Sequence, residues 1–240
     1  MRIEPSMSER FGFVAILGRP NVGKSSLVNR LVGQKVSITS RRPQTTRNRI
    51  LGICCRGTTQ VVFVDTPGMQ VGRHALDFSV NETAKAGARD ADIVAMMIEA
   101  RGWRDGDTHV LEHVKRLRLP TYLLINKVDL LRNPGAVLPL IKIASSKFEF
   151  AQIIPISVRR AHNLDCFMDL LSCELPDGPF GFPDGQVSVA KKEFVVSEFI
   201  REQIFRLVGA EVPYSIAVDV TADPNGEAGF ECFHAEIWVE

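Results

Sequence analysis

The sequence predicts an α/β protein, with a mostly parallel sheet and helices on both faces, followed by a smaller α+β unit. Two observations predict the main unit. Apolar runs of strand length alternate with amphipathic runs of helical length, and the first strand leads through a glycine-rich loop into a helix. A third observation divides the chain, because residues 175–190 are rich in Pro and Gly. We therefore expect a main domain over 1–174, a linker over 175–190 and a small second domain over 191–240.

The glycine-rich loop is the strongest local signal in the chain. It lies between an apolar strand over 11–17 and a helix over 26–32, and its pattern is Gly, four residues, then Gly-Lys-Ser. The glycines let several backbone N–H groups converge on one anion, and the helix N-terminus adds partial positive charge. Lys24 is expected to reach the β- and γ-phosphates of a nucleotide, and Ser25 to ligate Mg²⁺. The expected phosphate-binding residues are Gly18, Arg19, Pro20, Asn21, Val22, Gly23, Lys24, Ser25 and Ser26.

A long loop and a hairpin follow. Residues 34–49 have no sustained periodicity and are rich in hydroxyls and arginines, and a loop of this length is usually functional or disordered. Strands are expected over 50–55 and 61–65. The second ends at Asp65, where a carboxylate can hold Mg²⁺ directly or through water, and Gly68 can offer its N–H to a γ-phosphate. The expected site residues here are Asp65, Thr66, Pro67 and Gly68.

The rest of the main domain continues the alternation. Strands are expected over 93–98, 121–125 and 153–156, and helices over 75–88, 105–117, 134–147 and 163–173, the last with Asn163 as its N-cap. In a parallel sheet, ligands bind outside the carboxyl ends of the strands. The glycine-rich loop, the Asp65 segment, the run from Asn126 to Asp129 and Ser157 each follow a strand directly. We therefore expect all four on one rim of the sheet.

The run Asn126-Lys127-Val128-Asp129 selects the base of the nucleotide. A carboxylate at position 129 accepts from both the N1–H and the exocyclic amino group of guanine, whereas adenine presents a lone pair at N1 and no amino group at C2. A polar group left unpaired in this way costs roughly 1–3 kcal/mol, so guanine is expected. Lys127 is expected to lie along the base, and Asn126 to brace the surrounding loops.

Composition and charge set the broad class. The odd set of Cys54, Cys55, Cys166, Cys173 and Cys232 contains no Cys-x-x-Cys pair, so we expect reduced thiols, some of them buried, rather than a zinc site. No apolar run approaches the ~18 residues of a membrane span, and the N-terminus lacks the apolar region of a secretion signal. Residues 1–183 carry a net charge of +8 and residues 184–240 carry −7. The basic first part suits a polyanionic ligand.

These motifs together resemble the translation-factor-type GTPases and, within them, the Era family. The Era-like stretches are Gly18 to Ser25, Gly33 to Ser40, Gln44 to Arg47, Asp65 to Gly68, Asn126 to Asp129 and Gly209 to Tyr214. The resemblance implies a P-loop G domain that hydrolyses GTP with Mg²⁺ as a molecular switch, followed by a KH-like RNA-binding domain. It also implies a role in small (30S) ribosomal subunit assembly and 16S rRNA maturation. A cytoplasmic monomer is expected, with peripheral association with the inner face of the cell membrane as a further option.

The resemblance also implies roles for single residues around the phosphates. Residues 34–49 correspond to switch I, with Thr46, or alternatively Thr45, completing the Mg²⁺ shell begun by Ser25 and Asp65. The expected catalytic residues are Lys24, Thr46 and Gly68.

Two further positions bear on the base and on a second cation. Ser157 and Val158 stand where the family usually has Ser-Ala, in a loop that offers a backbone N–H to the guanine oxygen. Asn21 occupies the place that helps hold K⁺ near the phosphates in related potassium-activated GTPases.

The residue that follows Gly68 departs from a common pattern. Ras-like proteins orient the attacking water with a glutamine at this place, but here it is Met69, and Gln70 comes one residue late. We therefore expect slow intrinsic turnover, with the water positioned by backbone, metal ions or a partner.

The end of the sequence leaves alternatives open. A helix over 191–208 and strands over 214–220 and 230–239 match the opening of a KH domain, but the sequence ends at Glu240, before the Gly-x-x-Gly loop that clamps nucleic acid. We therefore expect an incomplete KH-like domain over 191–240 and weakened RNA binding. One alternative is a slow-hydrolysing guanine-nucleotide-binding module that signals to protein or membrane partners. Another, a tRNA-modification GTPase, would need a different N-terminal domain.

Overall fold

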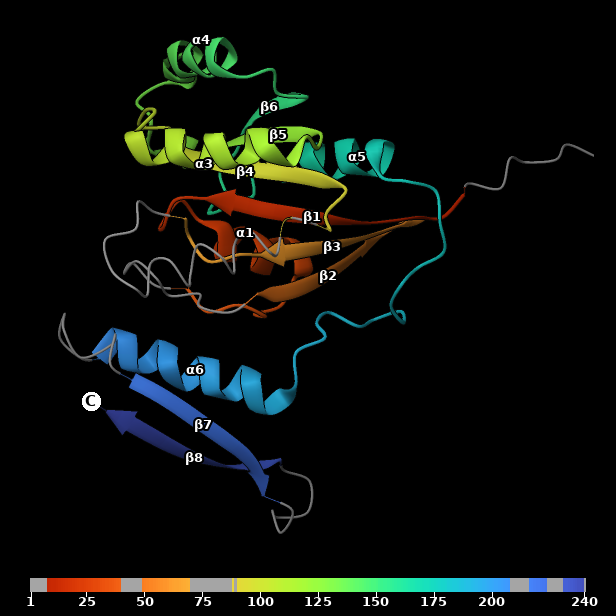
Figure 1. Cartoon of the computed structure of the whole chain (residues 1–240), viewed down its shortest axis with the longest axis vertical. Helices are drawn as coiled ribbons and strands as arrows, with labels where there is room; N and C mark the ends of the chain where they lie inside the picture. Colours follow the sequence, from red (N-terminus) through yellow and green to blue (C-terminus); the bar gives the residue numbers. More distant parts are fainter. Residues whose placement is uncertain are drawn as a thin grey trace, which may run out of the picture.

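The main unit is built on one twisted sheet. The computed structural model describes residues 8–39, 49–69, 88, 90–207, 216–223 and 231–239 of the 240. Within these, six strands lie in the order β2-β3-β1-β4-β5-β6, and only the β2–β3 pair is antiparallel (Figure 1). The strands are β1 (Arg10–Gly18), β2 (Ile50–Arg56), β3 (Thr59–Asp65), β4 (Ile93–Glu99), β5 (Thr121–Asn126) and β6 (Gln152–Pro155). The parallel α/β fold and the hairpin predicted from the sequence are confirmed.

Helices cover both faces of this sheet. They are α1 (Lys24–Val32), α3 (Asp105–Leu117), α4 (Leu138–Lys147) and α5 (Leu164–Glu174), with the short 3₁₀ helices η1 (Val128–Leu130) and η2 (Pro134–Val137). Leu27 of α1 and Phe167 of α5 belong to one buried cluster, whereas Val110 of α3 and Leu140 of α4 belong to another. Because both faces of β4 and β5 are buried, these strands are almost continuously apolar in sequence.

Two predicted helices differ in detail. The helix expected over 134–147 begins as the 3₁₀ turn η2 and becomes α-helical only at Leu138. The side chain of Asn163 does not cap α5, because its backbone is left-handed (φ 57°) and its amide donates to the carbonyl of Pro155 at 2.8 Å. Of the helix expected over 75–88, only Ala88 lies within the described residues, and it is helical.

The segment 175–190, predicted as a linker, lies against the main sheet. The N–H of Ile53 on β2 donates to the carbonyl of Val187 at 2.9 Å. The side-chain amide of Gln60 on β3 both donates to and accepts from the backbone of Phe182, each at 2.9 Å. The segment is therefore an ordered strap, because its backbone groups pair with the sheet.

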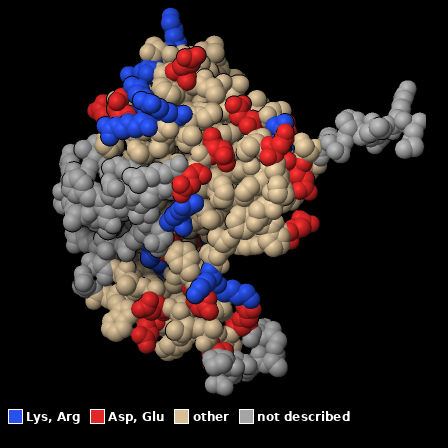
Figure 2. Space-filling model, turned by 45° about the vertical axis from the view of Figure 1, so that its right-hand side comes forward, with Lys and Arg blue, Asp and Glu red and all other residues tan. Residues whose placement is uncertain are grey.

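The second unit consists of a helix and a two-stranded ribbon. It comprises α6 (Lys192–Leu207) and the antiparallel strands β7 (Ile216–Asp223) and β8 (Cys232–Val239). Phe205 and Ile216 are buried, and Figure 1 shows the unit beside β2. Figure 2 shows acidic side chains, with a few basic ones, on this lower part of the molecule. The helix and two strands predicted from the sequence are confirmed.

Two expectations from composition can be compared with the structure. All five cysteines are free thiols, but none is buried, since Cys54 and Cys232 are half-buried and the others exposed. The expectation that some would be buried was wrong. In the part of the chain that the structure describes, no cluster of His, Cys, Asp and Glu is placed to hold a metal ion. Among the same residues, no helix is both long and apolar enough to cross a membrane.

Candidate nucleotide-binding site

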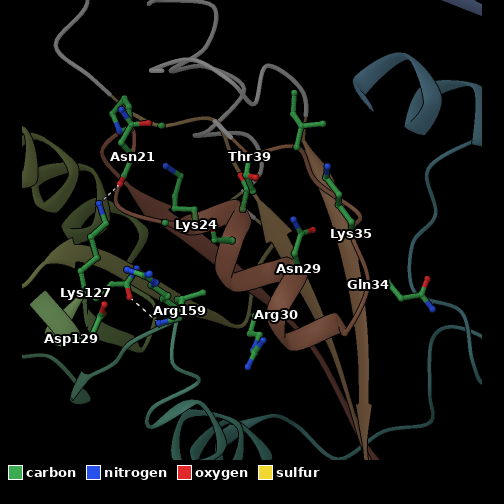
Figure 3. Close-up of a pocket in the computed structure, with 18 of the residues that line it drawn as sticks. Asn21, Lys24, Asn29, Arg30, Gln34, Lys35, Thr39, Lys127, Asp129 and Arg159 are labelled. Atoms are coloured by element: carbon green, nitrogen blue, oxygen red, sulfur yellow. Dashed lines mark hydrogen bonds between the residues drawn. The ribbon is translucent and has the colours of Figure 1, made fainter. Parts of the chain in front are cut away.

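A cavity of about 1100 Å³ lies at the carboxyl edge of the main sheet (Figure 3). The predicted site residues that line it are Pro20, Asn21, Gly23, Lys24, Ser25, Ser26, Gly68, Asn126, Lys127, Asp129 and Val158. These residues follow β1, β3, β5 and β6, so the single rim expected from the sequence is present. Among the described lining residues, Asp129 is the one acid, and the basic ones are Lys24, Arg30, Lys35, Lys127, Arg159 and Arg206.

Other predicted site residues do not line this cavity. They are Gly18, Arg19, Val22, Asp65, Thr66, Pro67 and Ser157. Val22 is part of the hydrophobic core, and the buried hydroxyl of Thr66 donates to the carbonyl of Ile16 at 2.7 Å. Thr46, the expected Mg²⁺ ligand, and its alternative Thr45 lie outside the described residues.

Lys24 is held inside the glycine-rich loop. Its amine donates to the carbonyls of Gly18 at 3.0 Å and Arg19 at 2.9 Å, and only 7% of the residue is exposed. Burial lowers the pKa of Lys24 to about 8, and the nearby Asp65 carboxylate only partly opposes this. A buried amine with weak carbonyl partners is suited to gain from a phosphate, which would stabilise its charged form.

Asp65, at the end of β3, is completely buried. Its Oδ2 accepts a hydrogen bond of 2.7 Å from the hydroxyl of Ser37, whereas its Oδ1 is buried without a partner among the described residues. Burial raises the pKa of Asp65, and hydrogen bonds from Ser25 and Ser37 oppose this effect. An unpaired carboxylate oxygen behind Ser25 fits a hydrated Mg²⁺ ion, because hard cations and their waters take oxygen ligands.

Asn126 joins the glycine-rich loop to the loop after β6. Its amide nitrogen donates to the carbonyl of Val22 at 2.8 Å, and its oxygen accepts from the N–H of Val158 at 3.1 Å. The side chain of Asn126 therefore bridges these two loops. Gly23 is needed for this contact, because its backbone is left-handed (φ 109°) and a Cβ there would lie 2.5 Å from the Asn126 amide nitrogen.

Lys127 and Asp129 form the wall expected to meet the base. The amine of Lys127 donates to the carbonyl of Asn21 at 2.7 Å and forms an ion pair with Glu99. Asp129 Oδ1 accepts from the hydroxyl of Ser157 at 2.6 Å, which fixes the direction of the carboxylate. Ser157 therefore acts on Asp129 rather than on the cavity directly.

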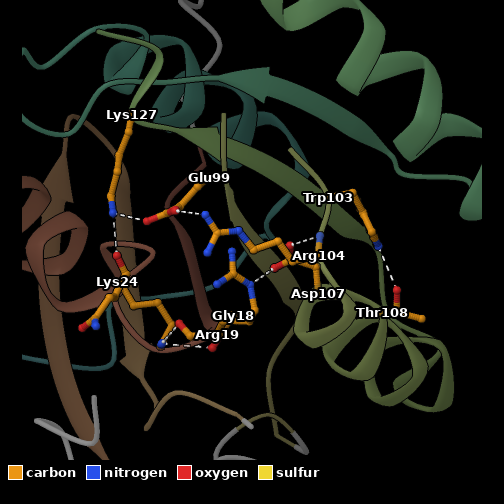
Figure 4. Close-up of polar contacts among 10 residues, drawn as sticks. Gly18, Arg19, Lys24, Glu99, Trp103, Arg104, Asp107, Thr108 and Lys127 are labelled. Carbon is orange, nitrogen blue, oxygen red and sulfur yellow. Dashed lines mark hydrogen bonds and ion pairs between the residues drawn. The ribbon is translucent and has the colours of Figure 1, made fainter. Parts of the chain in front are cut away.

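The side chain of Arg19 does not line the cavity but pairs with helix α3, so a phosphate-binding role stays a prediction for the backbone of the loop. Its Nε donates to the buried Asp107 of α3 at 2.6 Å, and the other oxygen of Asp107 accepts from the N–H of Arg104 at 2.9 Å (Figure 4). A Cβ on Gly106 would lie 2.4 Å from Cδ of Arg19, so the arginine stem packs tightly against α3. Arg19 thus connects the glycine-rich loop to helix α3, which packs on the sheet.

The Asp65 to Gly68 segment packs directly on the glycine-rich loop. The N–H of Met69 donates to the carbonyl of Gly18 at 3.2 Å, and a Cβ on Gly68 would lie 2.7 Å from the backbone nitrogen of Pro20. The Met69 side chain is buried in the core on the α3 side of the sheet. Met69 is therefore a core residue, and its side chain also lacks a group that could orient a water molecule.

Sequence reasoning missed Asn29, which shapes the start of the 34–49 loop. Its side-chain oxygen accepts from the N–H groups of Val36 and Ser37, both at 2.9 Å, and its amide donates to the Ser37 carbonyl at 2.7 Å. The available signal was a polar residue one helical turn after Ser25.

Sequence reasoning also missed Glu202 of α6, which fastens the same loop to the second unit. Its buried carboxylate accepts from both the N–H (3.1 Å) and the hydroxyl (3.2 Å) of Thr39, and it pairs with Lys35 and Arg206. Burial alone would raise the pKa of Glu202, but Lys35, the Thr39 N–H and Arg206 together lower it. Because Arg206 and Lys35 also line the cavity, the second unit reaches the nucleotide-binding site.

Comparison with known proteins identifies the family. A family model described as "50S ribosome-binding GTPase" matches residues 13–127. The chain is 43% identical over 230 residues to GTPase Era of Coxiella burnetii (strain Dugway 5J108-111), covering 95% of this chain and 77% of that protein. It is 40% identical over 230 residues to GTPase Era of Histophilus somni (strain 129Pt), with shares of 95% and 77%.

Solved structures agree with this result. A crystal structure of Era in complex with MgGDPNP and nucleotides 1506–1542 of 16S ribosomal RNA matches with a TM-score of 0.92 and 37% identity, covering 97% of this chain and 80% of that one. A variant of Aquifex aeolicus Era bound to GDP·AlF4⁻ matches with a TM-score of 0.91 and 37% identity, with shares of 96% and 79%. Fold, site and comparisons together show that this chain belongs to the Era family of GTPases.

Proposed function

We propose that this chain binds and hydrolyses GTP with Mg²⁺ as a molecular switch in assembly of the small (30S) ribosomal subunit and maturation of 16S rRNA. The observation that carries the proposal is the cavity in which Asn126 ties the loop of Lys24 to the loop of Val158. One bridging amide thus sets the distance between the phosphate end and the base end of the site. The Era structure solved with MgGDPNP and part of 16S rRNA supports both the nucleotide and the RNA.

The phosphate end would work through charge and backbone donors. Lys24 would exchange its carbonyl partners for the β- and γ-phosphates, and Gly68 would offer its N–H to the γ-phosphate. Ser25 and Asp65, together with Thr46, would hold Mg²⁺, which when bound neutralises charge that gathers on the phosphate oxygens. Since Met69 is buried in the core, the attacking water would be positioned by other groups.

The base end would read guanine. Asp129, held in place by Ser157, would accept from the N1–H and the amino group of the base. The N–H of Val158 already donates to Asn126, so that bond would have to be shared if the same group also met the guanine oxygen.

A potassium ion near Asn21 is a separate proposal. Asn21 lines the cavity, has a left-handed backbone (φ 65°) and presents its carbonyl to Lys127. A cation beside the phosphates would supply charge as an arginine finger does. Phosphate release should then be faster in KCl than in NaCl at equal ionic strength, and equal rates would reject the ion.

The proposal extends to the partners of the protein and to its location. The small ribosomal subunit and its 16S rRNA are the proposed partners, and the proposed site of action is the cytoplasm, with a monomeric protein. The alternative, a slow-hydrolysing module that signals to protein or membrane partners, is not favoured, because a relative was solved with GDP·AlF4⁻, which resembles a phosphate in transfer.

The test measures phosphate release by the 240-residue chain in potassium buffer. GTP and ATP are compared, with and without an RNA oligonucleotide that matches the 3′ end of 16S rRNA. We expect turnover of GTP but not ATP, and an increase with RNA. Equal turnover of ATP would overturn the guanine assignment. If GTP turnover does not respond to saturating RNA, the GTPase activity stands and the proposed stimulation by RNA is wrong.

A further inference from the structure

The strongest unexplained feature beside the cavity is the partly buried carboxylate of Glu99, the last residue of β4. It does not line the cavity, yet its side chain, only 13% exposed, forms an ion pair with the Lys127 amine (Figure 4). We infer that Glu99 is a positioning residue for the guanine base, acting through Lys127. This inference rests on the proposed nucleotide binding.

The geometry gives the Lys127 amine two fixed acceptors. One is the carboxylate of Glu99, and the other is the carbonyl of Asn21 at 2.7 Å. The two acceptors come from the end of β4 and from the glycine-rich loop. The aliphatic stem of Lys127 therefore spans a defined gap between them, along the wall that Asp129 shares.

The backbone around Glu99 fixes this arrangement. Glu99 lies beside Asn126 in the β4–β5 register, and the N–H of Ala100 donates to the Asn126 carbonyl at 2.8 Å. The peptide that precedes Lys127 is thus hydrogen-bonded to the peptide that follows Glu99. Lys127 itself has a left-handed backbone (φ 69°), which turns its side chain back toward β4 and the loop.

A long lysine side chain loses rotamer freedom when a ligand packs against it, and this loss weakens binding. Anchoring the amine in advance removes part of that loss before the base arrives. The stem then presents a flat apolar surface to the ring, whichever purine substituents it carries. Glu99 should therefore affect affinity for the base without affecting the recognition of the guanine amino group, which belongs to Asp129.

Two other cations lie near Glu99. Arg104 approaches its other oxygen at 3.7 Å, and Arg19 contributes to the field that lowers the pKa of Glu99 against the opposing effect of burial. Both arginines also have Asp107 as a partner, Arg19 through its side chain and Arg104 through its N–H. Lys127 has no carboxylate among the described residues other than Glu99.

The experiment measures dissociation constants of GDP, IDP and ADP for the wild type and for Glu99→Gln, Lys127→Met and the double variant. Methionine keeps the aliphatic stem and removes the amine. We expect Glu99→Gln and Lys127→Met each to raise the dissociation constant of GDP about 3- to 10-fold, because binding must then order one long side chain. The double variant should bind GDP no more weakly than Lys127→Met alone, because both changes remove the same anchor.

IDP separates this role from that of Asp129, since inosine lacks the 2-amino group. The ratio of IDP to GDP affinity should stay within about twofold in Glu99→Gln, whereas Asp129→Ala should reduce the preference for GDP. Glu112→Gln is the matched control, because Glu112 pairs with Lys115 on the exposed face of α3, and it should leave the GDP affinity unchanged.

Each outcome bears on one claim. The positioning role is wrong if Glu99→Gln lowers GDP affinity as much in the Lys127→Met background as it does alone. It is also wrong if Glu99→Gln alone leaves GDP affinity unchanged. In both cases GDP binding by the protein stands. Thermal unfolding of each variant checks the fold, and Lys127→Met tests the same anchor independently of Glu99. A wild type that bound GDP no better than ADP would overturn the proposed function and the inference together.

Discussion

The hydroxyl of Ser37 donates a hydrogen bond of 2.7 Å to Oδ2 of Asp65, inside the protein. This bond joins the start of the 34–49 loop to the carboxylate proposed to hold Mg²⁺. Asn29 fixes the backbone of Ser37 from the other side. A change in the metal site therefore reaches the loop through one buried contact.

Ser37→Ala tests the strength of this contact. Removing a donor from a buried carboxylate should lower the free energy of unfolding near neutral pH by about 1–3 kcal/mol. The deficit should shrink as the pH falls, because the pKa of Asp65 is already raised and its protonated form needs fewer donors. Urea unfolding at neutral and acidic pH measures both effects. Ser146→Ala, which removes a hydroxyl from the exposed face of α4, is the control and should be nearly neutral. A Ser37 deficit independent of pH would contradict the account.

Gly23→Ala should abolish most nucleotide binding. The new Cβ would meet the Asn126 amide at 2.5 Å in a left-handed conformation (φ 109°), which breaks the bridge to Val22. We expect about a 100-fold weaker GDP affinity, corresponding to about 3 kcal/mol. Gly33→Ala is a matched control, since it is also left-handed (φ 79°) but has no atom within 4 Å of the added Cβ. Fluorescent GDP titration should show near-normal affinity for the control, and equal losses in both variants would argue against the Asn126 bridge.

Met69→Gln tests whether the missing glutamine limits turnover. The side chain of Met69 is 1% exposed and packed in the core, so an amide there would be buried without designed partners. We expect a loss of about 1–3 kcal/mol in unfolding free energy and no increase in GTP turnover. Met168→Gln in the opposite core is the control for destabilisation alone. A clear rise in phosphate release by Met69→Gln would show that the position faces the nucleotide in the active state.

Nucleotide affinity should depend on pH through Lys24. Its pKa is lowered to about 8 by burial, and phosphates favour the protonated amine, so binding takes up a proton above that pH. GDP affinity should therefore be constant below about pH 8 and fall up to tenfold per unit above it. Isothermal titration in two buffers of different ionisation enthalpy would detect the proton. Lys24→Met should bind GDP weakly and show no such pH dependence. This variant also serves as the control for titration of the guanine base itself.

The link between the two units should depend on pH in the acid range. The pKa of Glu202 is lowered from its usual 4.5, so its ionised form stabilises the fold above that value and the contribution is lost as the pH falls through the folded pKa. Glu202→Gln should cost about 1–3 kcal/mol near neutral pH and progressively less in acid. Glu231→Gln removes an exposed ion pair with Lys192 and should cost under about 0.5 kcal/mol. Equal costs in the two variants would mean that the Thr39 contact adds little.

The sequence predicted those features that local pattern determines. The bounds of α3 (Asp105–Leu117) agree with prediction because acidic residues in its first turn are a local signal for a helix N-terminus. The rim of motifs follows from the rule that parallel strands present their carboxyl ends together.

The features that could not be predicted depend on pairs far apart in the chain. Glu99 and Lys127 are separated by 28 residues, and Thr39 and Glu202 by 163. No periodicity reveals such contacts. The ion pair between the Arg19 side chain and Asp107 of α3 could not be predicted either, since the two residues are 88 positions apart. The strap over 175–190 was unforeseen for the same reason, since its hydrogen bonds go to β2 and β3.

The excess of basic side chains around the cavity acts on a nucleotide before any contact forms. A polyanion that diffuses to within about 8 Å, the screening length in physiological salt, is drawn toward this edge of the sheet. ATP and GTP carry the same phosphate charge, so both should be captured at similar rates. The choice between them then falls to departure, because a base that cannot pair with Asp129 leaves sooner. Guanine preference in this protein is thus expected to be a matter of residence time rather than of arrival.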